Sequence, residues 1–320
     1  MSDFPKFVEI HEEGPREGFQ IEPGPISTVD KIKLIDALSK TGLKHIQACS
    51  FVNPRLVPGW ADAEQVVEGF MAHDGVEYTG LYFNGNGLDR ALAFKDKLTI
   101  SGSISLTASE GFTKKNLNRT HEENMSAMKR HVTSHLELGI PVNRIGVMAA
   151  FGCNYEGDIS PDTVVKTLRD GMAIAQETGA EITLFSLADT MGWAAPHRIE
   201  KVIGEVRSVW PNIDISLHLH DTRGLAIANA YSALKMGISR FDSTVGGLGG
   251  CPFAGQPKAA GNICTEELVL LCEELGISTG VDLDQLIEVG RLAEDIVDHQ
   301  LPGELIHAGS LDAFRRERLQ

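Results

Sequence analysis

Short apolar runs alternate with longer amphipathic segments eight times along this chain, and this rhythm limits the available folds more than any other feature. Short runs rich in β-branched residues are typical of buried strands, whereas apolar residues recurring at helical spacing indicate helices. The expected strands are Phe7–Ile10, His45–Ser50, Tyr78–Phe83, Leu98–Leu106, Arg144–Ala150, Glu181–Leu187, Ile213–His220 and Arg240–Val245. The helical patterns between them include Val29–Thr41, Ala61–His73, Glu122–Leu138, Pro161–Thr178, Pro196–Val209 and Leu225–Met236.

The units follow one another without a linker. Ser160-Pro161 marks a helix start, and glycines end several helical patterns, at Gly42, Gly139, Gly179 and Gly237. Eight such units over about 240 residues have the length and rhythm of a closed (β/α)8 TIM barrel in the α/β class. An open doubly wound sheet is the rival, because periodicity does not reveal whether a sheet closes.

The chain continues beyond the eighth unit. The segment from Thr265 to about His299 predicts two further helices separated by Gly276–Gly280. We therefore expect one catalytic domain over residues 1–299, including these helices, and a C-terminal tail over residues 300–320. The charged run at the end of the tail predicts a solvated, frayed helix.

Charge and composition exclude several classes of function. Lys and Arg total 29 against 44 Asp and Glu, and a net charge of −15 argues against nonspecific nucleic-acid or membrane binding. The N-terminal residues do not form a leader pattern, and the chain lacks an apolar run of about 18 residues, so we expect a soluble, cytoplasmic protein. An odd number of scattered cysteines predicts reduced thiols: Cys49, Cys153, Cys251, Cys264 and Cys272.

His218-Leu219-His220 places two imidazoles one residue apart at the end of an expected strand. Side chains on a strand repeat every second residue, so both rings point the same way and could hold one divalent cation. The motif alone does not separate metal ligands from core or surface histidines. In a barrel, however, the chemistry lies where strands end. Reactive side chains do follow the other expected strands, at Arg16, Glu17, Gln47, Ser50, Ser109–Asn116, Cys153, Asp189, Thr190 and Gly246–Gly255.

A metal site needs oxygen ligands beside the histidines. Glu17 is the nearest candidate in a closed barrel, and Asn262 could add an amide oxygen. By ligand softness this set favours Zn²⁺, yet with open water positions it is compatible with Mg²⁺ or Mn²⁺. The alternative for Glu17 is an ordinary acidic residue in a polar turn.

Arg16 lies in Gly14-Pro-Arg-Glu-Gly18, a turn stiffened by proline. A guanidinium there could stabilise an enolate or carboxylate oxygen. The alternative is a salt bridge with Glu17 or Glu13.

Two further segments contain residues suited to proton transfer or to substrate binding. The glycine-rich stretch Gly246–Gly255 suits a mobile lid, in which Cys251 could move a proton or be an incidental thiol. Lys114, Lys115 and Asn116, on a loop that begins at Ser109, could clamp an anionic, nucleotide-bearing substrate or simply face solvent. Arg144, at the start of a strand, is a more ambiguous candidate contact for the same substrate.

Several blocks together resemble the 3-hydroxy-3-methylglutaryl-CoA lyase family, within the metal-dependent TIM-barrel lyase and Claisen-condensation superfamily. The resemblance runs in order from about residue 8 to about residue 290. Its blocks are Gly14–Gln20, Ser50–Pro54, Ser109–Asn116, Gly152–Gly157, Asp189-Thr190, His218–Thr222, Gly247–Pro252 and Gly261-Asn262.

This resemblance implies cleavage of a 3-hydroxyacyl-CoA into acetyl-CoA and a keto acid by a retro-Claisen reaction. It implies a divalent cation, Mg²⁺ or Mn²⁺, on Glu17, His218, His220 and Asn262. It also implies that Arg16 stabilises the enolate, that Cys251 assists proton transfer, and that His220 or a metal-bound water accepts the hydroxyl proton, with Asp189 among the catalytic residues. The expected acyl-CoA contacts are Gln47, Ser50, Ser109, Lys114, Lys115, Asn116 and Arg144, in a homodimer.

This chain departs from the family pattern at two positions. Arg-Asp-Gly is here Arg16-Glu17-Gly18, and the acidic residue that usually ends the second strand is Gln47. Loss of that charge near Arg16 predicts either a more anionic substrate or a different partner for the arginine. The alternatives to the lyase are therefore an enzyme for another acyl-CoA, such as citramalyl-CoA or a longer branched 3-hydroxyglutaryl-CoA, and a non-catalytic CoA-ester-binding homologue. A condensing synthase is a further alternative, although synthases of this superfamily commonly carry longer C-terminal extensions.

Overall fold

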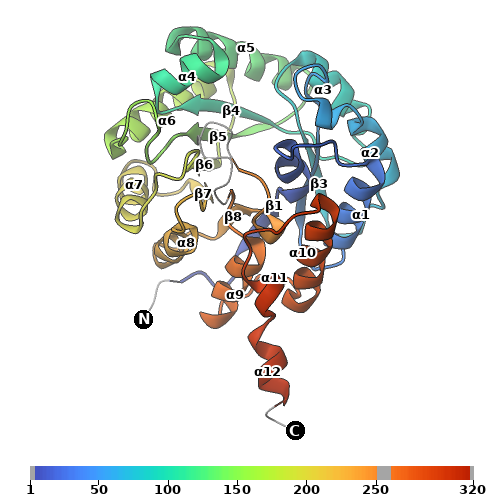
Figure 1. Ribbon diagram of the computed structural model, residues 1–320. Coiled ribbons are helices and arrows are strands. Elements are labelled where there is room, and N and C mark those ends of the chain that lie inside the picture. Colours follow the sequence, from blue (N-terminus) through green and yellow to red (C-terminus); the bar gives the residue numbers. More distant parts are fainter. Residues whose placement is uncertain (1–3, 251–260, 318–320) are drawn as a thin grey trace. The chain divides into compact units, whose positions relative to one another are not determined.

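The computed structural model describes residues 4–250 and 261–317, in which strands and helices alternate as predicted (Figure 1). The strands are β1 (Glu9–Glu12), β2 (His45–Ser50), β3 (Glu77–Leu81), β4 (Gly102–Thr107), β5 (Val142–Met148), β6 (Leu184–Ala188), β7 (Asp214–His218) and β8 (Arg240–Ser243). The helices are α1 (Thr28–Leu38), α2 (Ala63–Gly69), α3 (Gly85–Leu92), α4 (Glu110–Leu117), α5 (His121–Glu137), α6 (Pro161–Thr178), α7 (Pro196–Val209), α8 (Ala226–Lys235), α9 (Thr265–Glu274), α10 (Leu283–Val297), α11 (Leu305–Ala308) and α12 (Leu311–Glu317).

The described residues form two compact units that interleave along the chain. The first unit contains residues 4–5 and 101–241, and the second contains residues 6–100, 242–250 and 261–317. Strand β8 begins in the first unit and ends in the second.

Neighbouring strands pair in the parallel direction within each unit. In the first unit β4, β5, β6 and β7 lie side by side in sequence order, and in the second β1 pairs with β2 and β2 with β3. The register places Ala188 of β6 opposite His218 of β7, and the Asp189 N–H donates to the His218 carbonyl over 2.8 Å. Residues that follow neighbouring strands in one unit therefore come together at the same edge of its sheet.

Local sequence signals set most element boundaries. Helix α6 has the predicted bounds because Ser160 caps its first turn, Pro161 fills the first helical position, and Gly179 ends it at a φ of 79°. Strand β1 begins and ends two residues later than predicted. Its polar residues His11 and Glu12 pair with β2, a long-range contact that an apolar run does not reveal.

The prediction of a loop after the fourth strand is wrong, because Glu110–Leu117 forms helix α4. The Ser109 hydroxyl accepts a hydrogen bond from the Phe112 N–H over 3.0 Å, and Asn118 ends the helix in the left-handed conformation. Capping by serine therefore outweighs the polar composition that suggested a loop.

The helices pack on the sheets through close apolar contacts. A Cβ at Gly171 of α6 would lie 2.9 Å from Ile145 of β5, so glycine lets this helix approach its strand. Phe185 and Leu187 of β6 and Ile199 and Ile203 of α7 are fully buried. Burial of each such side chain contributes about 1.5–3 kcal/mol.

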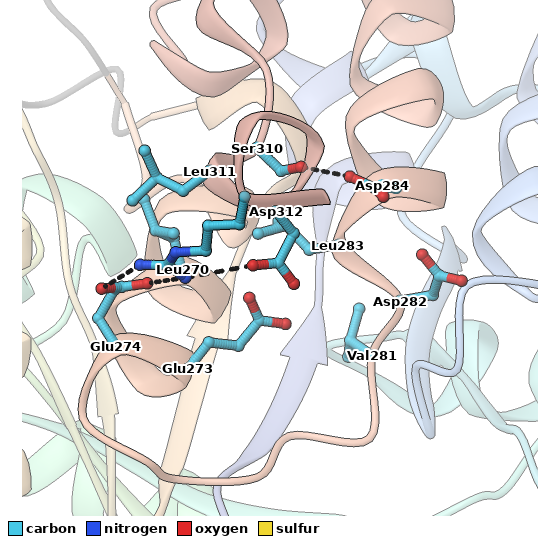
Figure 2. A pocket seen from close by; sticks show the side chains of 11 residues that line it. Leu270, Glu273, Glu274, Val281, Asp282, Leu283, Asp284, Ser310, Leu311 and Asp312 are labelled. Atoms are coloured by element: carbon cyan, nitrogen blue, oxygen red, sulfur yellow. Dashed lines mark hydrogen bonds and ion pairs between the residues drawn. The ribbon is translucent and has the colours of Figure 1, made fainter. Parts of the chain in front are cut away.

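The predicted C-terminal helices are present as α9 and α10, and α11 and α12 follow them. Helices α9, α10 and α12, together with residues 281–282 and Ser310, line a pocket of about 260 Å³ that carries five carboxylates (Figure 2). Arg315 pairs there with Glu274 over 2.9 Å and with Asp312 over 3.2 Å. Burial and the nearby acidic groups raise the pKa of Glu273. None of the predicted catalytic residues that the structure describes, Arg16, Asp189 and His220, lines this pocket.

In the described part of the chain, every helix is too short or too polar to cross a bilayer.

Candidate active site

The predicted imidazole pair is present in the first unit, and we call His218, His220 and Asp189 the histidine half. The Nε2 atoms of His218 and His220 lie 3.3 Å apart. The Nδ1 atom of His220 lies 2.9 Å from the Thr190 carbonyl. A carbonyl only accepts, so Nδ1 carries the proton and Nε2 keeps its lone pair for a cation or a proton.

Asp189 follows β6 and is fully buried. Its Oδ1 accepts from the Trp193 N–H over 2.6 Å and from the Ala194 N–H over 3.0 Å. Burial raises the pKa of this carboxyl to about 6, although His220 and the two N–H donors act in the opposite direction. Its Oδ2 is buried without a hydrogen-bond partner in the described residues, which leaves one oxygen able to accept a proton.

The arginine half lies in the second unit and consists of Arg16, Glu17, Gln47 and Asn262. Gly14–Gly18 forms one π-helical turn in which Pro15 occupies an early position. The Glu17 N–H donates to the Glu13 carbonyl over 2.7 Å, which closes the turn. The turn carries Arg16 and Glu17 directly after β1, as predicted.

Arg16 is buried and makes the predicted alternative contacts. Its Nη2 lies 2.8 Å from Glu13 Oε2 and 3.0 Å from Glu17 Oε2, and its Nε donates to Gln47 Oε1. Gln47 therefore lies beside the arginine, as the second departure from the family pattern required. The carboxylate of Glu13 pairs with the guanidinium, which is one of the two salt bridges named as alternatives.

Asn262 is held beside Glu17. A Cβ at Gly261 would lie 1.5 Å from the Gly249 carbonyl oxygen, so only glycine allows the two chain segments to cross there. The Asn262 Nδ2 donates to Glu17 Oε1 over 3.1 Å and to the Leu248 carbonyl over 3.2 Å. Its buried Oδ1 has no hydrogen-bond partner among the described residues.

Each half by itself carries atoms of the kinds that bind a divalent cation. Two nitrogens bound about 2.1 Å from one metal at 90–110° are about 3.0–3.4 Å apart, which agrees with the 3.3 Å between His218 and His220. Glu17 offers a carboxylate, and the unpartnered Asn262 Oδ1 offers a neutral oxygen of the kind that hard cations accept.

Two buried carboxylates that belong to none of the sequence motifs support the arginine half. Glu12 Oε1 accepts from the Gly14 N–H over 2.7 Å and from the Val245 N–H over 2.9 Å, and Oε2 accepts from the Thr265 hydroxyl over 2.6 Å. Burial raises the pKa of Glu12 to about 8. The burial of Glu12 could have been predicted from the sequence. Glu12 follows Ile10 by two residues, and this spacing puts the acid on the buried face of the strand.

The second of these carboxylates, Glu266, lies in the first turn of helix α9 and also accepts main-chain hydrogen bonds. Its two oxygens accept from the Gly246 N–H over 3.1 and 2.9 Å, and the Cys264 thiol donates to it over 2.9 Å. Burial raises the pKa of Glu266 to about 7. In the sequence this residue has only the appearance of an acidic first helical turn, so its burial could not be anticipated.

The remaining predicted residues are spread along their units. Ser109 is buried as the cap of α4 and accepts a hydrogen bond from the Cys153 thiol over 3.2 Å. Lys114, Lys115 and Asn116 are exposed in the last turns of α4. Three further predicted residues lie elsewhere: Ser50 is buried at the end of β2, Arg144 is the third residue of β5, opposite Ser103, and Cys251 lies outside the described residues.

Strand–helix units with imidazoles, carboxylates and a guanidinium directly after the strands define a (β/α)8 barrel enzyme. The HMGL-like family matches residues 7–293, and the chain belongs to this family of enzymes. The predicted fold, a TIM barrel with extra C-terminal helices, is confirmed by the likeness to solved structures.

Three similar proteins illustrate this relationship. The chain is 38% identical over 299 residues to the hydroxymethylglutaryl-CoA lyase YngG of Bacillus subtilis, covering 93% of this chain and 96% of the relative. A crystal structure of the B. subtilis HMG-CoA lyase has a TM-score of 0.85 at 36% identity, covering 98% of this chain and 99% of that one. An HMG-CoA lyase from Acinetobacter baumannii in complex with coenzyme A and 3-methylmalate has a TM-score of 0.84 at 36% identity, covering 97% of each chain.

Proposed function

We propose that this enzyme cleaves 3-hydroxy-3-methylglutaryl-CoA into acetyl-CoA and acetoacetate. The observation that carries the proposal is the match to relatives named hydroxymethylglutaryl-CoA lyase, which extends over 93% of this chain at 38% identity. The donor set of the two halves supports the same chemistry, because it offers a cation site, proton acceptors and a guanidinium.

We assign a divalent cation, Mg²⁺ or Mn²⁺, to His218, His220, Glu17 and Asn262. A bound cation would polarise the substrate hydroxyl and lower its pKa. The hydrogen bond from His220 to Thr190 fixes the ring so that Nε2 is the ligand atom. The carboxylate of Glu17 is oriented by Asn262 and Arg16.

The reaction requires one proton to leave the 3-hydroxyl group and one to reach the departing carbon. We assign the first transfer to His220 and Asp189, with Asp189 as the acceptor when His220 binds the cation. The C2–C3 bond then breaks, its electron pair forms the acetyl-CoA enolate, and the carbinol carbon becomes the keto group of acetoacetate. Arg16 stabilises the enolate oxygen through its N–H donors. Cys251, outside the described residues, is assigned to return a proton to the enolate carbon.

We assign the acyl-CoA to Lys114, Lys115 and Asn116, exposed cations and an amide that suit phosphate groups, and to Ser109 at the start of the same helix. Further assigned contacts are Gln47, Ser50 and Arg144. We also propose that the enzyme is a cytoplasmic homodimer without nucleic-acid or membrane partners, which size-exclusion chromatography and cell fractionation would test.

A direct assay tests the function. Protein treated with EDTA and then supplied with Mg²⁺ or Mn²⁺ should release acetyl-CoA from 3-hydroxy-3-methylglutaryl-CoA, and activity should disappear without the metal. Acetoacetate formed in equal amount identifies the bond that breaks. Net condensation of acetyl-CoA with a keto acid would instead identify a synthase, and tight CoA-ester binding without turnover in any metal would identify a binding homologue.

A second candidate function is cleavage of a different 3-hydroxyacyl-CoA. The observation that favours it is the contact of Arg16 with Glu13 and Gln47, which changes the charge around the proposed enolate site. A substrate panel that includes citramalyl-CoA and longer branched 3-hydroxyglutaryl-CoA esters separates the two candidates by their kcat/KM ratio.

A further inference from the structure

A second group of potential metal ligands lies on the first two strands of the second unit. Glu9 and His11 are two residues apart on β1 and share one face of the strand. His45 is the first residue of β2 and lies opposite His11 in the parallel register. The group lies one strand repeat, roughly 7 Å, before Glu13 and Gln47, and it is separate from the ligands assigned above.

The ligand atoms of this group converge on one carboxylate oxygen. Glu9 Oε1 lies 2.8 Å from His11 Nε2 and 3.6 Å from His45 Nε2. One ligand atom from each of the three residues lies within 4.8 Å of the other two. The imidazole rings stack with their centroids 4.3 Å apart, so both present Nε2 to the same side.

The other nitrogen of each imidazole faces a second carboxylate. His11 Nδ1 lies 3.9 Å from Asp242 Oδ1, and His45 Nδ1 lies 3.5 Å from Glu77 Oε2. Histidines that bind metals commonly direct their other ring nitrogen at a carboxylate, which fixes the tautomer and makes the ligand nitrogen more basic. Both histidines face such a carboxylate here, at the 3.5–3.9 Å distances of ion pairs.

The charges of the cluster also favour a cation. The carboxylates of Glu9, Asp242 and Glu77 all lie within 4 Å of an imidazole nitrogen, and their negative charge attracts a cation. The three ligands are only partly buried, and a pocket of about 120 Å³ reaches Glu9 and His45. A cation could therefore enter without unfolding of the strands.

We propose that Glu9, His11 and His45 form a second divalent-cation site, suited to Zn²⁺. Two imidazole nitrogens and one carboxylate are a ligand set of open zinc sites, in which a fourth position holds water or another small ligand. Mg²⁺ prefers oxygen ligands and should bind this set more weakly.

The test measures Zn²⁺ binding to the full-length chain after removal of metals. Zinc titration with a competing chelator, in excess Mg²⁺, is performed on His218→Gln/His220→Gln, which lacks the imidazoles assigned to the lyase reaction. We expect this variant to bind one Zn²⁺ with a Kd of about 1 μM or lower, and Co²⁺ in place of zinc should give the absorption bands of a four-coordinate site. Adding His11→Gln/His45→Gln should raise the Kd by about 100-fold or more.

Three variants in the same background make the result specific. Glu9→Gln keeps the size of the side chain and should weaken Zn²⁺ binding by at least about 10-fold, a test that stands if the double histidine variant does not fold. Glu77→Gln should weaken binding by about 10-fold by removing the partner of His45. The matched control is His131→Gln/His135→Gln, a ring pair on α5 with centroids 4.0 Å apart, and it should leave the Kd unchanged.

Two results would overturn the proposal. One is the absence of Zn²⁺ binding below about 100 μM in the His218→Gln/His220→Gln variant, which would identify the cluster as an ion-pair network only. The other is Zn²⁺ binding that survives substitution of His11, His45 and Glu9. Neither result bears on the lyase activity, because the assay records metal binding in a variant without the proposed catalytic imidazoles.

Discussion

The two halves of the proposed centre are held in place by different kinds of partner. In the histidine half, main-chain groups fix the side chains: the Thr190 carbonyl holds His220, and two N–H groups hold Asp189. In the arginine half, side chains hold one another: Arg16 contacts Glu13, Glu17 and Gln47. Main-chain partners are available to any sequence with this fold, whereas a side-chain network changes with each substitution. We therefore expect the arginine half to be where enzymes of this kind diverge in substrate preference.

The largest expected effect is in the histidine half. His220→Ala should lower kcat/KM for 3-hydroxy-3-methylglutaryl-CoA by about 1,000-fold or more, because it removes a ligand of the cation that lowers the pKa of the substrate hydroxyl. Steady-state kinetics at saturating Mg²⁺ provide the measurement, and His131→Gln, on helix α5, serves as the histidine control. A loss of less than about 10-fold in kcat/KM would contradict the assignment of His220 to the proposed centre.

The next effect concerns the support of the arginine half. Glu12→Ala should lower the free energy of unfolding by about 3 kcal/mol, because it leaves the Gly14 and Val245 N–H groups and the Thr265 hydroxyl without their buried partner. Glu12→Gln keeps an acceptor for both N–H groups and should cost less than about 1 kcal/mol. Urea denaturation compares the two, and equal losses would show that the hydrogen bonds are not the cause.

Glu266 should give the arginine half a distinctive pH dependence. Its pKa of about 7 in the folded chain lies above its ordinary value of 4.5, so its contribution to stability is fully present below about pH 4.5 and is lost as pH rises through 7. The stability of the native chain relative to Glu266→Gln should therefore fall by about 3 kcal/mol between pH 4.5 and 8. Urea midpoints at several pH values measure this change, and a difference that stays constant or increases with pH would contradict the assignment.

Moving a carboxylate from one partner of Arg16 to another tests whether the side-chain partners of this arginine affect activity. Glu13→Gln should lower kcat/KM by about 10-fold, because the guanidinium loses a charged partner 2.8 Å away that helps to position it. The double variant Glu13→Gln/Gln47→Glu moves the carboxylate to the other partner of Arg16 and should recover most of the loss. Absence of recovery would mean that Glu13 acts through something other than its charge.

The smallest effect is expected in the acidic pocket of Figure 2, which belongs to neither half. Glu273→Gln should raise the free energy of unfolding by about 0.3 kcal/mol at pH 7, because it removes one of several carboxylates that repel one another across solvent. The gain should vanish near pH 4, where the carboxyl is protonated in both states. A thermal melting series records it, and a destabilised variant would contradict the repulsion.

Local signals predicted the strand–helix order and the histidine half. The spacing of His218 and His220 is visible in three residues, although strand β7 ends at His218 and not at His220 as predicted. Ser160, Pro161 and Gly179 mark the bounds of α6 to the residue. The partners of Arg16 depended instead on which segments the fold brings together. The choice between a salt bridge and an open guanidinium could not be made until Glu13 and Gln47 were placed beside it. Glu266 and the pair formed by His11 and His45 likewise involve partners that are distant in sequence.

The interleaving of the two units has a consequence for how the chain emerges from the ribosome. Residues 6–100 are synthesised early, but Phe7 pairs with Ser278, and Thr41 accepts a hydrogen bond from Asp282 over 2.7 Å. Residues 101–241 form one continuous stretch and hold most of their unit. The middle of the chain can therefore fold before the C-terminal helices have been synthesised. The first three strands, in contrast, complete their contacts only once those helices are present. Because such distant contacts form slowly and unpaired strands aggregate readily, the N-terminal hundred residues should be the part of the nascent chain most dependent on chaperones.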